Sequence, residues 1–120
     1  MNESILTSTK KLLGIDEEYK HFDPDIIMHI NAVFMTLTQI GVGPKEGFMI
    51  TDEMAEWTDF IPEGPLLNTI KSYMYLRVRQ LFDPLLTSSV SESMNRIISE
   101  FEWRISVAVD PGKEEHQNEQ

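Results

Sequence analysis

The chain has 120 residues, and 41% of them are hydrophobic. A chain of this length can bury one hydrophobic core but is too short for two. Twenty acidic residues against ten basic ones give a net charge of -10. This charge argues against gripping a phosphate backbone and against a polybasic membrane anchor. Because cysteine is absent, disulfides, thiolate metal sites and thiol nucleophiles are excluded. No signal-peptide pattern opens the chain and no stretch is apolar enough to span a bilayer, so we expect a soluble intracellular protein.

Two amphipathic helices are expected in the first third of the chain. The first covers about 5–13, with Lys10 near its C-terminal end, where a cation suits the helix dipole. For the second, we expect Asp23 as the N-cap and Pro24 as the first helical residue. Its apolar residues recur at spacings of three and four, and Gly41 ends it.

The middle segment, residues 46–63, is irregular and strongly acidic. We expect a short strand from Phe48 to Ile50 and a helical turn capped by Thr51. Its apolar residues, Trp57 among them, predict packing on the helices rather than disorder. The segment has no basic residue, and six acidic residues lie in it: Glu46, Asp52, Glu53, Glu56, Asp59 and Glu63.

Two longer amphipathic helices follow. The third helix begins at Pro65 and must end before Pro84, because proline disfavours helix at the residue before it. The fourth begins near Ser89, which has capping-box spacing to Glu92, and stops at Asp110.

These patterns predict an all-α fold. We expect a compact bundle of three to four main helices, with a small irregular or β element around residues 46–63. The helical domain covers 1–110, and a disordered polar tail covers 111–120. The simplest interpretation of the methionine and aromatic residues on the helical stripes is that they form the core: Met28, Phe34, Met74 and Phe101.

Enzyme chemistry has little support in the residues. Asp25 and His29 lie four apart on a helix and can face one another, so a metal-dependent or carboxylate enzyme stays open as one alternative. A surface ion pair explains the same spacing more simply. No nucleophile elbow, P-loop or dinucleotide fingerprint is present. We therefore expect a protein that is not an enzyme and has no cofactor.

The basic residues concentrate on the last two helices. Ion pairing with the acidic middle segment, within one chain or between subunits, is the simpler interpretation, and DNA recognition is the alternative. Trp57 is expected either to anchor the acidic segment or to belong to a protein interface. The basic residues concerned are Lys71, Arg77, Arg79, Arg96 and Arg104.

The order of these elements resembles a known family. A short helix ends in KKLLGI, FDPDIIMHIN opens the second helix, and an acidic segment with a tryptophan follows a glycine-rich turn. PLLNTIKSYMYLRVRQLFDP and VSESMNRIISEFEWRISVA form the last two helices. Over residues 4–109 this pattern is similar to the small head–tail connector proteins of tailed bacteriophages, also called adaptor or head-completion proteins.

The resemblance implies a structural protein of the virion, present in the host cytoplasm during assembly. It implies a homo-oligomeric ring of about a dozen subunits. The ring would bind beneath the portal protein, extend the DNA channel and receive a tail or stopper protein. It also implies a portal-docking segment near the C-terminus, which in this sequence contains Trp103, Ile105, Val107, Val109 and Asp110.

A ring needs two different faces of each subunit. We expect the basic face to contain Lys71, Arg77, Arg79 and Arg96, and the acidic face to contain Glu53, Glu56, Trp57 and Asp59. Charge reversal at Arg77 and Arg79 should then weaken self-association, most strongly at low salt. DNA would pass an acidic lumen without specific binding. The alternative function is a small helical DNA-associated or regulatory protein that acts through the last two helices.

Overall fold

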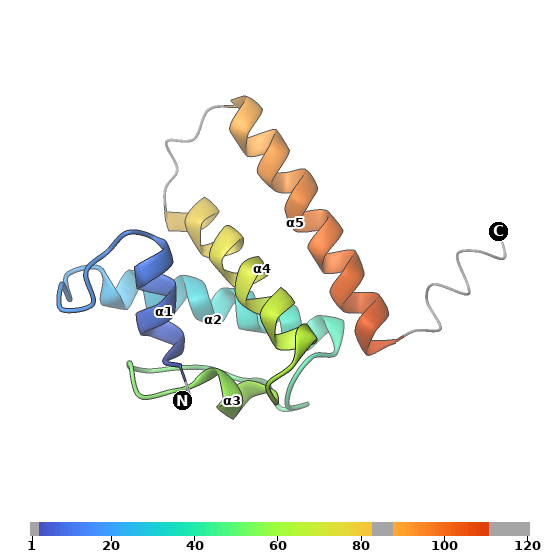
Figure 1. The fold of residues 1–120 in the computed structure, drawn as a ribbon, viewed down its shortest axis with the longest axis horizontal. Coiled ribbons are helices and arrows are strands. Elements are labelled where there is room, and N and C mark those ends of the chain that lie inside the picture. The colour runs from blue at the N-terminus through green and yellow to red at the C-terminus, as the bar shows by residue number, and fades with distance from the viewer. Residues whose placement is uncertain (1–2, 83–87, 111–120) are drawn as a thin grey trace, which may run out of the picture.

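The structure is a computed structural model that describes residues 3–82 and 88–110. These residues are mostly helical and confirm the all-α prediction (Figure 1). Among them, strand-like pairing is limited to one isolated bridge between Ser4 and Glu56, so the strand expected at Phe48–Ile50 is wrong. The tail predicted at 111–120 lies outside the described residues. The helices are α1 (Ile5–Leu12), α2 (Asp23–Ile40), α3 (Trp57–Phe60), α4 (Pro65–Phe82) and α5 (Ser88–Val109).

Most helix ends lie where local signals place them. α2 ends before Gly41, whose φ of 109° suits glycine and whose N–H donates to two carbonyls of the last turn. α4 begins at Pro65, as predicted. The start of α2 differs by one residue, because Phe22 is the N-cap and Asp23 is already helical. The Asp23 carboxylate instead forms an ion pair with Lys10.

α5 starts one residue earlier than expected. It begins at Ser88, so Ser89 lies inside the helix and is not its N-cap. The residue before Ser88 lies outside the described part of the chain. α5 ends at Val109, next to the predicted stop at Asp110.

Lys10 is the main charged residue of the interior. Its side chain is only 2% exposed, and Nζ lies 2.8 Å from Asp23 Oδ1 as an ion pair. The same Nζ donates hydrogen bonds to the carbonyls of Glu17 and Tyr19, at 3.0 and 2.8 Å. Lys10 therefore ties α1 to the connection that follows it and to the first turn of α2.

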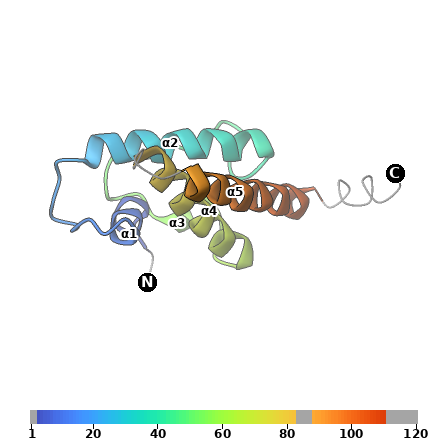
Figure 2. The ribbon, with the colours of Figure 1, turned by 90° about the horizontal axis from the view of Figure 1, so that it is seen from above.

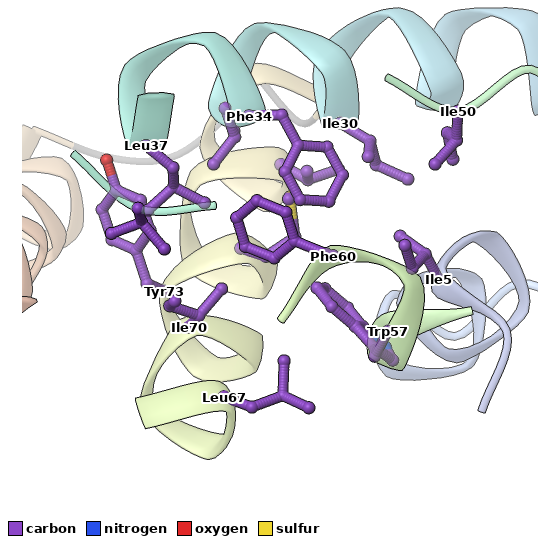
Figure 3. Packing of buried hydrophobic residues seen from close by; sticks show 14 of the residues in the cluster. Ile5, Ile30, Phe34, Leu37, Ile50, Trp57, Phe60, Leu67, Ile70 and Tyr73 are labelled. Atoms are coloured by element: carbon purple, nitrogen blue, oxygen red, sulfur yellow. The ribbon is translucent and has the colours of Figure 1, made fainter. Parts of the chain in front are cut away.

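The core lies around α4, which packs against both α2 and α5. Figure 2 shows α2 along one side of the molecule, with α4 and α5 beside it. The α2 side chains Phe34 and Leu37 meet the α4 side chains Ile70 and Tyr73, and Phe60 of α3 closes the cluster (Figure 3).

Of the four residues expected in the core, three are confirmed and one is wrong. Phe34 and Met74 are fully buried, and Phe101 is half-buried against the cluster. Met28 is 60% exposed, because it lies on the side of α2 opposite the buried stripe.

Candidate interaction surfaces

The acidic middle segment is a surface layer with an apolar underside. Asn31 of α2 holds it by two hydrogen bonds to the backbone of Ile50, donating to the carbonyl at 2.9 Å and accepting from the N–H at 2.8 Å. The underside contributes Ile50, Trp57 and Phe60 to the core, which agrees with the predicted packing. Its outward carboxylates are exposed: Glu46, Asp52, Glu53, Asp59 and Glu63.

The helical turn in this segment lies later than predicted. Thr51 does not cap a helix; α3 begins at Trp57, with Glu56 as its N-cap. The Glu56 N–H donates to Asp59 Oδ2 at 2.8 Å, which closes the turn. Glu56 therefore takes the N-cap position expected of Thr51, and Asp59, the third residue of the helix, accepts the Glu56 N–H as in a capping box.

Trp57 anchors this segment, which is one of its two predicted roles. Its side chain is buried to 2% exposure, and Nε1 donates to Ser8 Oγ of α1 at 2.9 Å. The ring faces the core with Phe34 (Figure 3). Trp57 therefore supports the acidic surface from below, and its indole is not available to a ring neighbour.

The basic residues of α4 and α5 are mostly engaged within the chain. Lys71 Nζ lies 3.5 Å from Glu3 Oε1, Arg77 Nη1 lies 3.0 Å from Glu102 Oε2, and Arg104 Nη2 lies 2.6 Å from Glu100 Oε1. Arg79 donates to the hydroxyl of Tyr75 at 2.9 Å. Within the described residues, none of these ion pairs uses the acidic middle segment. Arg96 lies exposed on α5.

A partly buried polar cluster joins α4 to α5. The Tyr73 hydroxyl donates to Glu102 Oε2 at 2.6 Å, and Arg77 Nη1 donates both to that oxygen and to the Tyr73 hydroxyl, at 3.0 and 3.1 Å. Burial raises the pKa of Tyr73 well above its ordinary value, and the hydrogen bond to Glu102 raises it further. Arg77 is therefore committed to the fold.

The segment expected to dock on the portal is only partly accessible. Ile105 is fully buried, and Val109 packs near Gly41. Val107 is half-buried, while Trp103 is 43% exposed and Asp110 is exposed. The two exposed residues are therefore the ones that a partner can reach without unfolding α5.

The outward side of α2 forms an apolar groove that the sequence analysis missed. Met28 and Met35 lie on α2 with 60% and 65% exposure, and Met49 faces them from the middle segment with 72% exposure. Phe48 and Glu46 complete the opposite wall of a groove of about 830 Å³. The signal was present: a buried stripe at 26, 30, 33 and 37 leaves 28, 32 and 35 on the other face.

The region of Asp25 and His29 does not develop into a metal site in the described residues. Asp25 is exposed and His29 half-buried on α2. Across residues 3–82 and 88–110, no group of three or more histidine and carboxylate side chains is placed to hold a metal ion. In the same residues, no helix combines the length and the apolar character needed to cross a bilayer.

One comparison with known proteins decides the family. A family profile described as "Phage connector protein" matches residues 5–112, which is nearly the whole chain. The chain belongs to this family. No curated protein and no solved structure matches it significantly.

The matched region of this connector protein begins with α1 and extends past α5. The match therefore covers all five helices described, and the resemblance to phage connector proteins is confirmed. Phage connector proteins are structural, so the protein has a structural role in the phage particle and contacts other head or tail components. The exposed surfaces described above are where such contacts can form.

Proposed function

We propose that this connector protein forms a homo-oligomeric ring of about a dozen subunits beneath the portal protein. The ring extends the DNA channel and receives a tail or stopper protein, and its subunits are made in the host cytoplasm before they join the particle. The observation that carries this proposal is the family match over residues 5–112.

The distribution of charge supports a channel role. The carboxylates of the middle segment point outward, and the net charge of the chain is -10. A surface of this sign repels DNA phosphates and so lets a duplex slide past it, the reverse of binding by counterion release. In the proposed ring, those carboxylates of this layer that do not contact a neighbouring subunit face the channel or its rim.

The proposed charged contact between neighbours is smaller than the sequence pattern implied. Trp57 is buried, and Arg77 and Lys71 already have partners in the chain. Glu53 and Asp59 remain exposed on the acidic face, Glu56 is half-buried there, and Arg79 and Arg96 remain on the basic face. Surface ion pairs contribute about 0–1 kcal/mol each, so these residues orient neighbours more than they hold them together.

The portal contact is proposed at the C-terminal end of α5. Asp110 is exposed there, and the apolar residues just before it are mostly used by the core. Docking therefore occurs at the end of the helix, without extraction of Ile105 or Val109 from their packing.

Electron microscopy of the purified full chain, alone and mixed with the portal protein of the same phage, tests the proposal. Closed rings or collars on the portal are the expected result. A protein that stays monomeric and leaves the portal bare would refute the ring. A salt-sensitive shift of duplex DNA by the same preparation would favour the alternative, a DNA-associated regulator.

A further inference from the structure

The residues of α2 that line the groove have the spacing of a helix-packing seam, but no helix of the described residues packs there. Met28, Ala32, Met35 and Gln39 lie at positions i, i+4, i+7 and i+11 and line the groove, so the small Ala32 lies between two large side chains. Methionine is flexible and polarisable and adapts to the shape of a docked surface. The seam is therefore suited to take the outward face of a further helix.

α5 presents an outward face with the same spacing. Arg96, Glu100, Trp103 and Val107 lie at i, i+4, i+7 and i+11 on the side of α5 that turns away from the buried Met94, Ile98 and Ile105. Trp103 is 43% exposed there. An exposed tryptophan in the middle of such a stripe is the residue type that most often anchors a protein interface.

The two surfaces are complementary in shape and charge. Two helical turns separate Met28 from Met35, a distance of about 10 Å along the axis, which is room for one indole between them. Sulfur–aromatic contacts between methionine and tryptophan add to the burial. Glu46 lies at the rim of the groove, and Arg96 lies exposed on the same face of α5 as Trp103, so these opposite charges can pair across the contact. Glu100, which lies between Arg96 and Trp103, already forms an ion pair with Arg104 at 2.6 Å.

We propose that the groove lined by Met28, Met35 and Met49 binds the outward face of α5 from a second copy of this chain, with Trp103 as the anchor. Because the groove and α5 are different faces, the contact is heterologous: each subunit gives one face and receives the other. The inference rests on the proposed ring and names the surfaces that close it. Trp103 is then covered by a neighbouring subunit and not by the portal.

Cysteine crosslinking tests this contact directly, because the natural chain has no cysteine. The variants Met35→Cys/Glu100→Cys and Met35→Cys/Val107→Cys keep Trp103 and place the second cysteine one turn to either side of it, so they cover both directions in which α5 can cross the groove. They are treated with a short bis-maleimide after rings, alone or on the portal, have been seen by electron microscopy. Met35→Cys alone and the pair Lys11→Cys/Glu100→Cys, which places one cysteine on α1, are the controls.

A ladder of crosslinked dimers, trimers and larger species from at least one groove pair, with neither control forming one, is the expected result. A link inside one chain stays at monomer size, and a two-fold contact stops at dimers. Rings without a ladder, a ladder in the control, or crosslinking of the α5 cysteine to the portal would overturn the groove contact and leave the ring intact. The absence of any ring would refute the proposed function itself.

A second measurement does not depend on crosslinking geometry. Trp103→Ala should raise the protein concentration needed for ring assembly by about tenfold or more. Leu12→Ala, which truncates an even more exposed apolar side chain on α1, should leave that concentration unchanged. Equal assembly by both variants would contradict the role of Trp103 as the anchor.

Discussion

Replacing Lys10 by methionine tests how the N-terminal part of the fold is held. The lysine ammonium is buried, pairs with Asp23 at 2.8 Å, and donates to two backbone carbonyls of the 14–22 connection. Methionine keeps most of the apolar stem and removes all three polar interactions. The variant therefore isolates the contribution of the charged group.

The expected loss of stability follows from the three interactions of the ammonium. Hydrogen bonds from a charged donor contribute about 1.5–3 kcal/mol each, and removal of one partner of a buried ion pair typically costs about 3–5 kcal/mol. Asp23 and the connection retain some access to water, which reduces the penalty. We expect a loss of about 3 kcal/mol, a large part of the roughly 5–15 kcal/mol that stabilises a domain.

Urea unfolding followed by circular dichroism measures this loss as a change in the free energy of unfolding. In thermal unfolding, the Tm of Lys10→Met should lie more than about 10 °C below that of the natural chain. Lys11→Met, at the exposed neighbouring position, should change the free energy of unfolding by less than about 0.5 kcal/mol. A loss below about 1 kcal/mol for Lys10→Met would refute the role assigned to the buried ammonium.

Three further predictions concern other parts of the fold. Because the folded-state pKa of Tyr73 lies above its unfolded value, its contribution to stability is complete below about pH 10 and is lost as the pH rises further. In chemical unfolding, the free energy of unfolding of Tyr73→Phe should therefore decrease less above that pH than that of the natural chain. The same decrease in both proteins would contradict the role assigned to the Tyr73 hydroxyl. Asn31→Ala should lower the free energy of unfolding by about 2 kcal/mol, because it removes two hydrogen bonds to the middle segment; a neutral result in urea unfolding would argue against this anchor. Gly43→Ala should destabilise more than Gly47→Ala by at least about 1 kcal/mol in the same assay, since both have positive φ but only at Gly43 would a methyl group overlap the Phe60 ring.

Helix ends set by local chemistry were predictable from the sequence. Pro65 has a fixed φ and no N–H to donate, which suits the first residue of a helix. Gly41 adopts a positive φ and donates its N–H to the last turn of α2, which ends that helix. Both effects can be predicted without knowledge of the tertiary structure. The apolar stripe of α2 was predictable for the same reason, because its period belongs to the helix itself. The fold class followed from these local features.

Features that depend on a distant partner could not be predicted. The sequence suggested a separate local role for Lys10 and for Asp23, and only the fold shows that the two side chains form an ion pair with each other. Tyr73 and Glu102 lie 29 residues apart, so no spacing rule links them. Met28 was wrongly predicted to lie in the core. A methionine near an apolar stripe can be assigned to the core or to the surface only when the buried face of the helix is known.

The acidity of the chain and its exposed methionines have opposite effects on the assembly of the proposed ring. A ring of about a dozen copies at -10 each would carry a charge on the order of -120, and this self-repulsion opposes assembly. Surface ion pairs cannot offset it, because the basic side chains are few and mostly engaged within the chain. Apolar burial does not depend on charge and is weakened little by salt. In the proposed ring, an acidic surface that lets DNA slide therefore requires an apolar contact between subunits, and the proposed pairing of the α2 groove with Trp103 would provide it.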